Sequence, residues 1–204
     1  MKPLFSIIII FTFVGCIQNK ADLNLVTKEL KYSASYWHFN QQADSYEFYL
    51  VHYISIDQKG NFELMRHDEW LGTPHYFKGI IQDTTLRKLI NAAFSKDNFK
   101  YDYTWKIEDG IYDGYTYCFD YTKVKSNDNK IIQFIPNKSP AQIELLSLNL
   151  ENLIYYSKGN KLDTLDLKNY TEKLEQLSIL EHGGRLPKPT KPALIENKIL
   201  KSKN

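Results

Sequence analysis

The amino-acid sequence predicts an α+β domain, a two-layer sandwich in which amphipathic helices cover one face of an antiparallel sheet made from two hairpins. Two observations predict it. Two pairs of segments rich in aromatic and β-branched residues each flank a short turn, as in β-hairpins. Each pair is followed by a segment whose apolar residues recur at spacings of three and four, as on one face of a helix. The two units cover roughly residues 46–95 and 111–157.

The first hairpin pairs Tyr46–Ile56 with Phe62–His67. The intervening turn ends in Gly60, which can adopt a positive φ. We expect the apolar residues at even positions from Phe48 to Ile56 to face the core. An earlier strand is predicted at Tyr36–Phe39.

The first helix is predicted from an N-cap at Asp83 to about Phe94, after a short edge strand at Tyr76–Ile81. Its apolar stripe consists of Leu86, Leu89, Ile90 and Ala93.

The second hairpin pairs a strand at 115–122 with a return strand at 130–135. Aromatic residues alternate with small or polar ones in the first of these strands, which predicts a single aromatic face. Ser139 and Pro140 then open a second helix, because proline is favoured at the first helical position. A third helix is predicted at about 167–180.

The N-terminus has the pattern of a secretory signal. Lys2 precedes an apolar run from Leu4 to Phe13, and the sequence Phe13-Val14-Gly15-Cys16 follows directly. The run of about ten residues is too short to span a bilayer, which takes roughly 20.

This N-terminal pattern resembles the lipobox of bacterial lipoproteins. The resemblance implies cleavage before Cys16, diacylation of that cysteine and a lipid bilayer as partner. Ile17 in the second mature position implies the outer membrane, with the chain facing the periplasm. The layout is also similar to that of uncharacterised small lipoproteins of the Bacteroidota, a resemblance that implies no particular activity.

These features divide the chain into four parts. We predict a signal peptide at 1–15, a lipidated tether at 16–30, a single α+β domain at 31–182 and an extended or disordered tail at 183–204.

Composition limits the classes of partner and the sources of stability. The net charge is +2 and charged residues make up 25% of the chain, so we do not expect nucleic acid as a partner. No cofactor motif is present. If Cys16 carries lipid, Cys118 has no partner for an intramolecular disulfide, and stability must come from an aromatic-rich core.

Metal-binding side chains are densest where the first hairpin ends. His67, Asp68, Glu69 and His75 are weak candidates for a divalent-ion site, because their spacing matches no recognised metal motif. Charged residues are also expected at the end of a hairpin simply because that end is exposed to solvent. We therefore predict no metal site.

Other candidates for catalysis are equally ambiguous. Paired carboxylates suited to glycoside cleavage could come from Glu108, Asp109, Asp113 and Asp120. The structural interpretation is favoured, because glycines beside them indicate a turn. His52 and His38 are interpreted as half-buried structural histidines, and Cys118 as a small buried residue. No nucleophile motif accompanies them.

An aromatic cluster is the best candidate for binding. It consists of Tyr101, Tyr103, Trp105, Tyr112 and Tyr115, with charged residues in between. Such side chains stack on sugars or contribute to protein interfaces, although they also line cores. We expect a non-enzymatic binding module for a protein or envelope component, of which an immunity-type protein is one form. The alternative is a hydrolase acting on envelope glycans or peptides.

Overall fold

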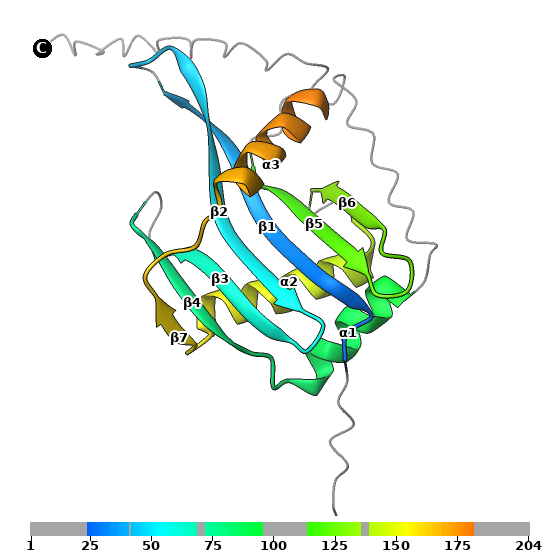
Figure 1. Cartoon of the computed structure of the whole chain (residues 1–204). Coiled ribbons are helices and arrows are strands. Elements are labelled where there is room, and N and C mark those ends of the chain that lie inside the picture. The colour runs from blue at the N-terminus through cyan, green and yellow to red at the C-terminus, as the bar shows by residue number, and fades with distance from the viewer. Residues whose placement is uncertain (1–23, 41, 69–71, 96–113, 136–138, 182–204) are drawn as a thin grey trace, which may run out of the picture.

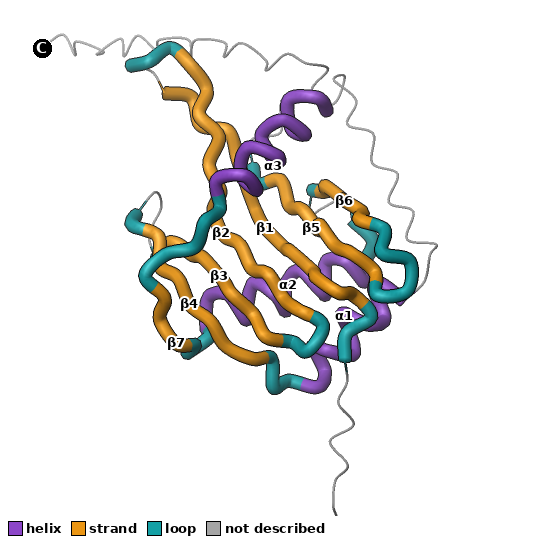
Figure 2. Tube along the Cα trace, in the orientation of Figure 1, coloured by secondary structure: helices purple, strands orange, loops and turns teal. Residues whose placement is uncertain are grey.

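The computed structural model describes residues 24–40, 42–68, 72–95, 114–135 and 139–181. They form one seven-stranded antiparallel sheet and three helices, which confirms the α+β class (Figures 1 and 2). The strand order is β6-β5-β1-β2-β3-β4-β7. The strands are β1 (Thr27–Asn40), β2 (Ser45–Asp57), β3 (Asn61–His67), β4 (Pro74–Ile80), β5 (Thr116–Lys123), β6 (Asn129–Phe134) and β7 (Asn160–Leu162).

β2 pairs with β3 across a turn in which Gly60 has a φ of 84°, and β5 pairs with β6. The helices α1 (Thr84–Ser95), α2 (Ala141–Tyr156) and α3 (Lys168–Glu181) start and end close to the predicted residues. The short strand β7 was not predicted, and it pairs with β4, which is therefore not an edge strand.

The central strand β1 is much longer than the segment predicted at Tyr36–Phe39. It begins at Thr27, and Leu25 before it is 1% exposed, so the fold starts ahead of the predicted boundary at residue 31. The start of this strand was missed because the polar stretch up to residue 30 was assigned to a tether, although Leu30, Tyr32 and Ala34 alternate with polar residues as in a strand.

One face of the sheet packs against α1 and α2. The buried residues of this core come from both helices and from strands β1 to β6. Tyr32, Phe119 and Phe134 are among its largest fully buried side chains, and the aromatic face predicted for the fifth strand packs here. This core is the main source of stability, because it buries the largest apolar area.

The opposite face carries α3 (Figure 1). Tyr170 and Leu174 of this helix form a smaller core with Tyr53, Met65 and Cys118 from the sheet. The Tyr170 hydroxyl lies 3.0 Å from Ser33 Oγ. The prediction that helices cover only one face is therefore wrong for α3. The prediction that Cys118 is a small buried residue is confirmed.

A β-bulge changes the faces of β2. Ala34 pairs with His52 whereas Ser35 pairs with Leu50, so Val51 is an extra residue. Ile54 and Ile56 point into the α1/α2 core, but Phe48 and Leu50 pack on the α3 side. The prediction that all even positions share one face is wrong, because one extra residue inverts the alternation.

We expect Leu174→Ala to lower the free energy of unfolding by about 3 kcal/mol, because it leaves a cavity under α3. Leu174 is 1% exposed in the smaller core. Urea denaturation measures the change, and hydrogen exchange should show faster exchange in α3. The exposed Glu172 provides the control, Glu172→Ala. An unchanged midpoint for Leu174→Ala would contradict the packing of α3.

Candidate binding surface

The paired ends of β1 and β2 project from the sheet as a two-stranded ribbon (Figure 1). β5 pairs with β1 only as far as Ser35, and β3 pairs with β2 only from His52 onward. We call the ribbon beyond these points, Tyr36–Asn40 paired with Ser45–Tyr49, the arm. It lies at the opposite end of β1 from the point where the described chain starts (Figure 1).

Aromatic cross-strand pairs run along the arm. Tyr36 stacks on Tyr49 with ring centroids 5.6 Å apart, on the side of the sheet that carries α1 and α2. The other side carries the edge-to-face pairs Trp37–Phe48 (5.1 Å) and Phe39–Tyr46 (5.3 Å). All six rings are half-buried, so both faces of the arm present aromatic surface. Such pairs also stabilise the ribbon itself.

Helix α3 supports the base of the arm. Trp37 Nε1 donates a hydrogen bond of 2.9 Å to Ser178 Oγ near the end of α3. Phe48 and Leu50 pack against the smaller core that includes Tyr170. The arm therefore leaves the sheet where this helix covers it.

The arm carries a carboxylate with a fixed position. Glu47 accepts hydrogen bonds from the Tyr49 hydroxyl and, at 2.7 Å, from Asn40 Nδ2. The bond from Tyr49, followed by that from Asn40, lowers the pKa of Glu47, so this side chain is charged at neutral pH. At the tip, Asn40 Oδ1 also accepts hydrogen bonds from the backbone N–H groups of Gln42 and Ala43.

The arm lacks cationic side chains. No lysine or arginine occurs between Ser33 and Ile56, although the whole chain contains 26 of these residues. The arm and its turn carry Asp44 and Glu47. An acidic, aromatic surface is suited to a partner with lysine or arginine side chains, which are attracted both to carboxylates and to ring faces.

His52 lies at the base of the arm, on the side of α2. Its ring is 2% exposed and lies among the rings of Tyr32, Tyr117 and Tyr155. Nδ1 lies 3.2 Å from the Tyr155 hydroxyl, whereas Nε2 is buried without a hydrogen bond in the described part of the chain. Burial lowers the pKa of His52 to about 3, so the ring is neutral. His52 is more deeply buried than predicted, whereas His38 is exposed rather than half-buried.

The predicted aromatic cluster is described at one residue. Tyr115 lies beside the arm, with its ring centroid 5.7 Å from that of Tyr36. The other four predicted residues, Tyr101, Tyr103, Trp105 and Tyr112, lie outside the described residues. Sequence reasoning missed Tyr36, Trp37 and Tyr49 as surface aromatics, although the density of aromatic residues from Tyr36 to Tyr53 was a visible signal.

The metal-site candidates are engaged in other contacts. Asp68 forms an ion pair with Arg66 (3.6 Å), and one of its carboxylate oxygens lies 3.2 Å from His75 Nε2. His67 Nδ1 lies 2.6 Å from the carbonyl oxygen of Gly72, and Glu69 lies outside the described residues. The described part of the chain contains no group of three histidine, cysteine or acidic side chains that could hold a metal ion.

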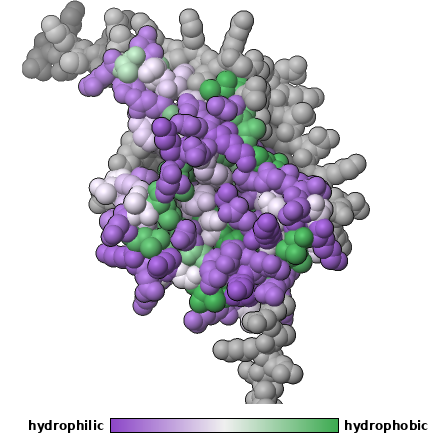
Figure 3. Space-filling model, in the orientation of Figure 1, coloured by the Kyte–Doolittle hydropathy of each residue, from purple (hydrophilic) through white to green (hydrophobic). Residues whose placement is uncertain are grey.

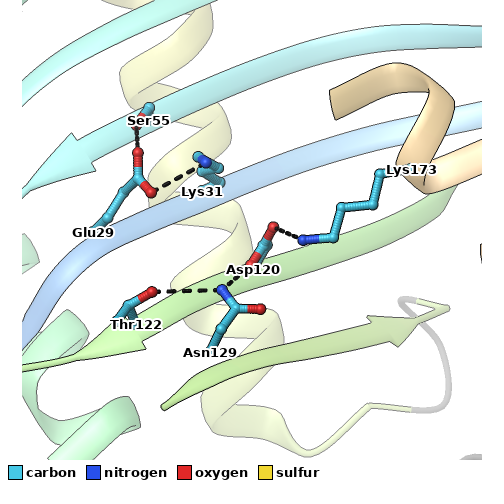
Figure 4. Close-up of polar contacts among 7 residues, drawn as sticks. All are labelled: Glu29, Lys31, Ser55, Asp120, Thr122, Asn129 and Lys173. Carbon is cyan, nitrogen blue, oxygen red and sulfur yellow. Dashed lines mark hydrogen bonds and ion pairs between the residues drawn. The ribbon is translucent and has the colours of Figure 1, made fainter. Parts of the chain in front are cut away.

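The carboxylate of Asp120 is also committed to a structural contact (Figure 4). This residue is 3% exposed, pairs with Lys173 of α3 at 2.8 Å and accepts a 2.8 Å hydrogen bond from Asn129. Glu29, Lys31 and Ser55 form a second polar group nearby on the same face. The surface on this side is mostly hydrophilic, with hydrophobic residues in separate patches (Figure 3). Asp109, Asp113 and Glu108 lie outside the described residues.

Comparison with known proteins gives no family assignment: no family model matches the chain, and no curated protein or solved structure matches it significantly. Within the described ranges, no helix is long and apolar enough to cross a membrane.

We expect His52 to make the protein less stable in acid. The unfolded chain takes up a proton on this histidine below pH 6.5, whereas the folded chain does so only near pH 3. The free energy of unfolding therefore falls as the pH is lowered from 6.5 to 3, by at most about 1.4 kcal/mol per pH unit. Urea midpoints at pH 7, 5 and 4 should show a smaller decrease for His52→Asn than for the wild type.

The exposed His38 provides the matched control, His38→Asn, which should follow the wild-type pH dependence. If His52→Asn loses stability in parallel with the wild type, burial of a neutral His52 is not the cause.

Proposed function

We propose that this chain is a lipoprotein anchored through Cys16 in the outer membrane and facing the periplasm. In this proposal it is a non-enzymatic module that binds a protein or another envelope component through the arm. The observation that carries the proposal is the arm itself, a projecting ribbon with half-buried aromatic residues on both faces. Tyrosine and tryptophan contribute large contact areas at low entropic cost, so they are common in binding surfaces.

The position of the arm relative to Cys16 supports this proposal. Cys16 and Leu25 are nine residues apart, so they can be separated by at most about 30 Å. The Leu25 backbone N–H bonds to the Gln58 carbonyl oxygen at 2.8 Å, which fixes it at the β2–β3 turn. β1 has 14 residues and extends about 45 Å from there to the tip of the arm. A lipid on Cys16 would thus hold the turn near the bilayer and leave the arm on the far side.

The chemistry of the described residues favours binding over hydrolysis. The hydrolase alternative would use His67, Asp68 and Glu69 or the carboxylates near Asp109. Among the described carboxylates, Asp68 forms an ion pair with Arg66, and Asp120 forms one with Lys173. Binding an immunity-type target needs only an accessible complementary surface, and the arm supplies aromatic anchors and a fixed carboxylate.

We expect Cys16→Ser to move the protein from the membrane fraction to the soluble periplasmic fraction, because it removes the acylated thiol. Fractionation followed by immunoblotting measures the shift. The matched control Gln18→Ser should stay with the membranes. Cys16→Ser protein that still sediments with the outer membrane would contradict the anchor.

We expect the double variant Phe39→Ser/Tyr46→Ser to weaken binding of the natural partner at least tenfold, because it removes the edge-to-face pair nearest the tip of the arm. The partner is first identified by affinity capture from envelope extracts, and titration calorimetry then compares the variants. Leu148, which is 55% exposed on α2, provides the control Leu148→Ser. Loss of affinity only in Leu148→Ser would place the binding surface on α2.

A further inference from the structure

We propose that the C-terminal segment of this chain, residues 182–204, binds the acidic, aromatic arm and competes there with an external partner. The competition rests on the proposed function of the arm. The contact between the segment and the arm does not rest on the proposed function, because both lie in the same chain.

The described chain ends close to the base of the arm. Ser178 of α3 accepts the hydrogen bond from Trp37, and the helix ends only three residues later at Glu181. The 23 residues that follow could extend about 75 Å, several times the length of the five-residue strands of the arm. Length therefore does not limit contact with either face.

The charges of the C-terminal segment and of the arm are complementary. The segment contains one acidic residue, Glu196, and six cationic ones, Arg185, Lys188, Lys191, Lys198, Lys201 and Lys203. The arm and its turn have two carboxylates, Asp44 and Glu47, and no lysine or arginine. The arm is thus an acidic surface, and the segment that follows α3 in the sequence is strongly cationic.

The arm offers a preformed contact for a cation. Hydrogen bonds from Tyr49 and Asn40 hold the Glu47 carboxylate in place, and His38 is its cross-strand neighbour. Tyr49, two residues further on, lies beside this carboxylate, because its hydroxyl donates one of these hydrogen bonds. A lysine or arginine near this carboxylate gains an ion pair and contact with ring faces, without the entropic cost of ordering the acceptor. Prolines 187, 189 and 192 suit an extended segment on an aromatic surface.

Covalent linkage makes a weak contact sufficient. The effective concentration of a short tethered segment is in the millimolar range. A segment whose free-peptide Kd is about 1 mM would therefore occupy the arm for roughly half of the time. An external partner binds only the unoccupied fraction, so its apparent affinity is reduced accordingly.

Limited proteolysis of the full mature chain tests the contact without any partner. Trypsin cleavage after Arg185, Lys198 and Lys201 is followed by mass spectrometry at 50 mM and 500 mM NaCl. We expect Asp44→Asn/Glu47→Gln to be cleaved at least threefold faster than the wild type at 50 mM. At 500 mM the two rates should converge, because salt screens the attraction.

The matched control, Glu63→Gln/Asp163→Asn, removes two exposed carboxylates outside the arm and should be cleaved at the wild-type rate. Equal rates for the wild type, the arm variant and the control at 50 mM would overturn the proposal. Urea midpoints verify that each variant is folded.

Crosslinking keeps the proposal testable if the arm variant fails to fold. A photo-crosslinking phenylalanine derivative replaces Lys188 in the otherwise wild-type chain. Adducts with residues 36–49 of the same chain support the proposal. Adducts only with other residues, or only between two chains, overturn it. Neither result depends on the affinity-capture experiment, so this proposal and the proposed function fail separately.

Discussion

The pairing of β1 with β2 is the constraint on which the rest of the structure depends. The two strands pair from Glu29–Asp57 to Asn40–Ser45, whereas their outer neighbours β5 and β3 pair with only about half of that length. Inside the sheet, the two paired strands lie between the two hydrophobic cores, one on each face. Beyond it, the same ladder continues as the arm. A two-stranded ribbon is at best marginally stable in water, so the arm requires support from side chains.

Two sets of contacts provide that support. Cross-strand aromatic pairs stabilise the ribbon along its length, and α3 holds its base through Ser178 and the smaller core. The helix is in turn fixed to the sheet by the pair between Lys173 and the buried Asp120, and by Tyr170 with Ser33. Removing Lys173 would leave the buried carboxylate of Asp120 without its ion-pair partner, which is costly. The pair between Asp120 and Lys173 in Figure 4 thus stabilises the arm indirectly, because it holds α3 against the sheet.

The parts of the fold that could be predicted are those with regular patterns. The β2–β3 turn has a glycine where a positive φ is needed, and α1 has a clear apolar stripe. The first half of β1 was missed because the polar stretch up to residue 30 was assigned to a tether, although Leu30, Tyr32 and Ala34 alternate there with polar residues. The bulge at Val51 depends on tertiary packing, and so does the face of the sheet against which α3 packs. Local sequence patterns do not contain this information. Tyr115, which lies beside the arm, was among the predicted binding residues. The arm itself was not recognised, because aromatic residues of a strand are ordinarily assigned to a core.

Distance from the bilayer tests the central claim, that a membrane anchor at one end of β1 presents the arm at the other. Cysteines introduced by Ala43→Cys at the tip of the arm and by Lys59→Cys at the β2–β3 turn each carry a donor dye. Full-length lipidated protein is reconstituted into vesicles that contain acceptor-labelled lipids. Energy transfer should be strong from position 59, which adjoins the Leu25–Gln58 contact, and much weaker from position 43. Equal transfer from both positions, or stronger transfer from position 43, would contradict the account.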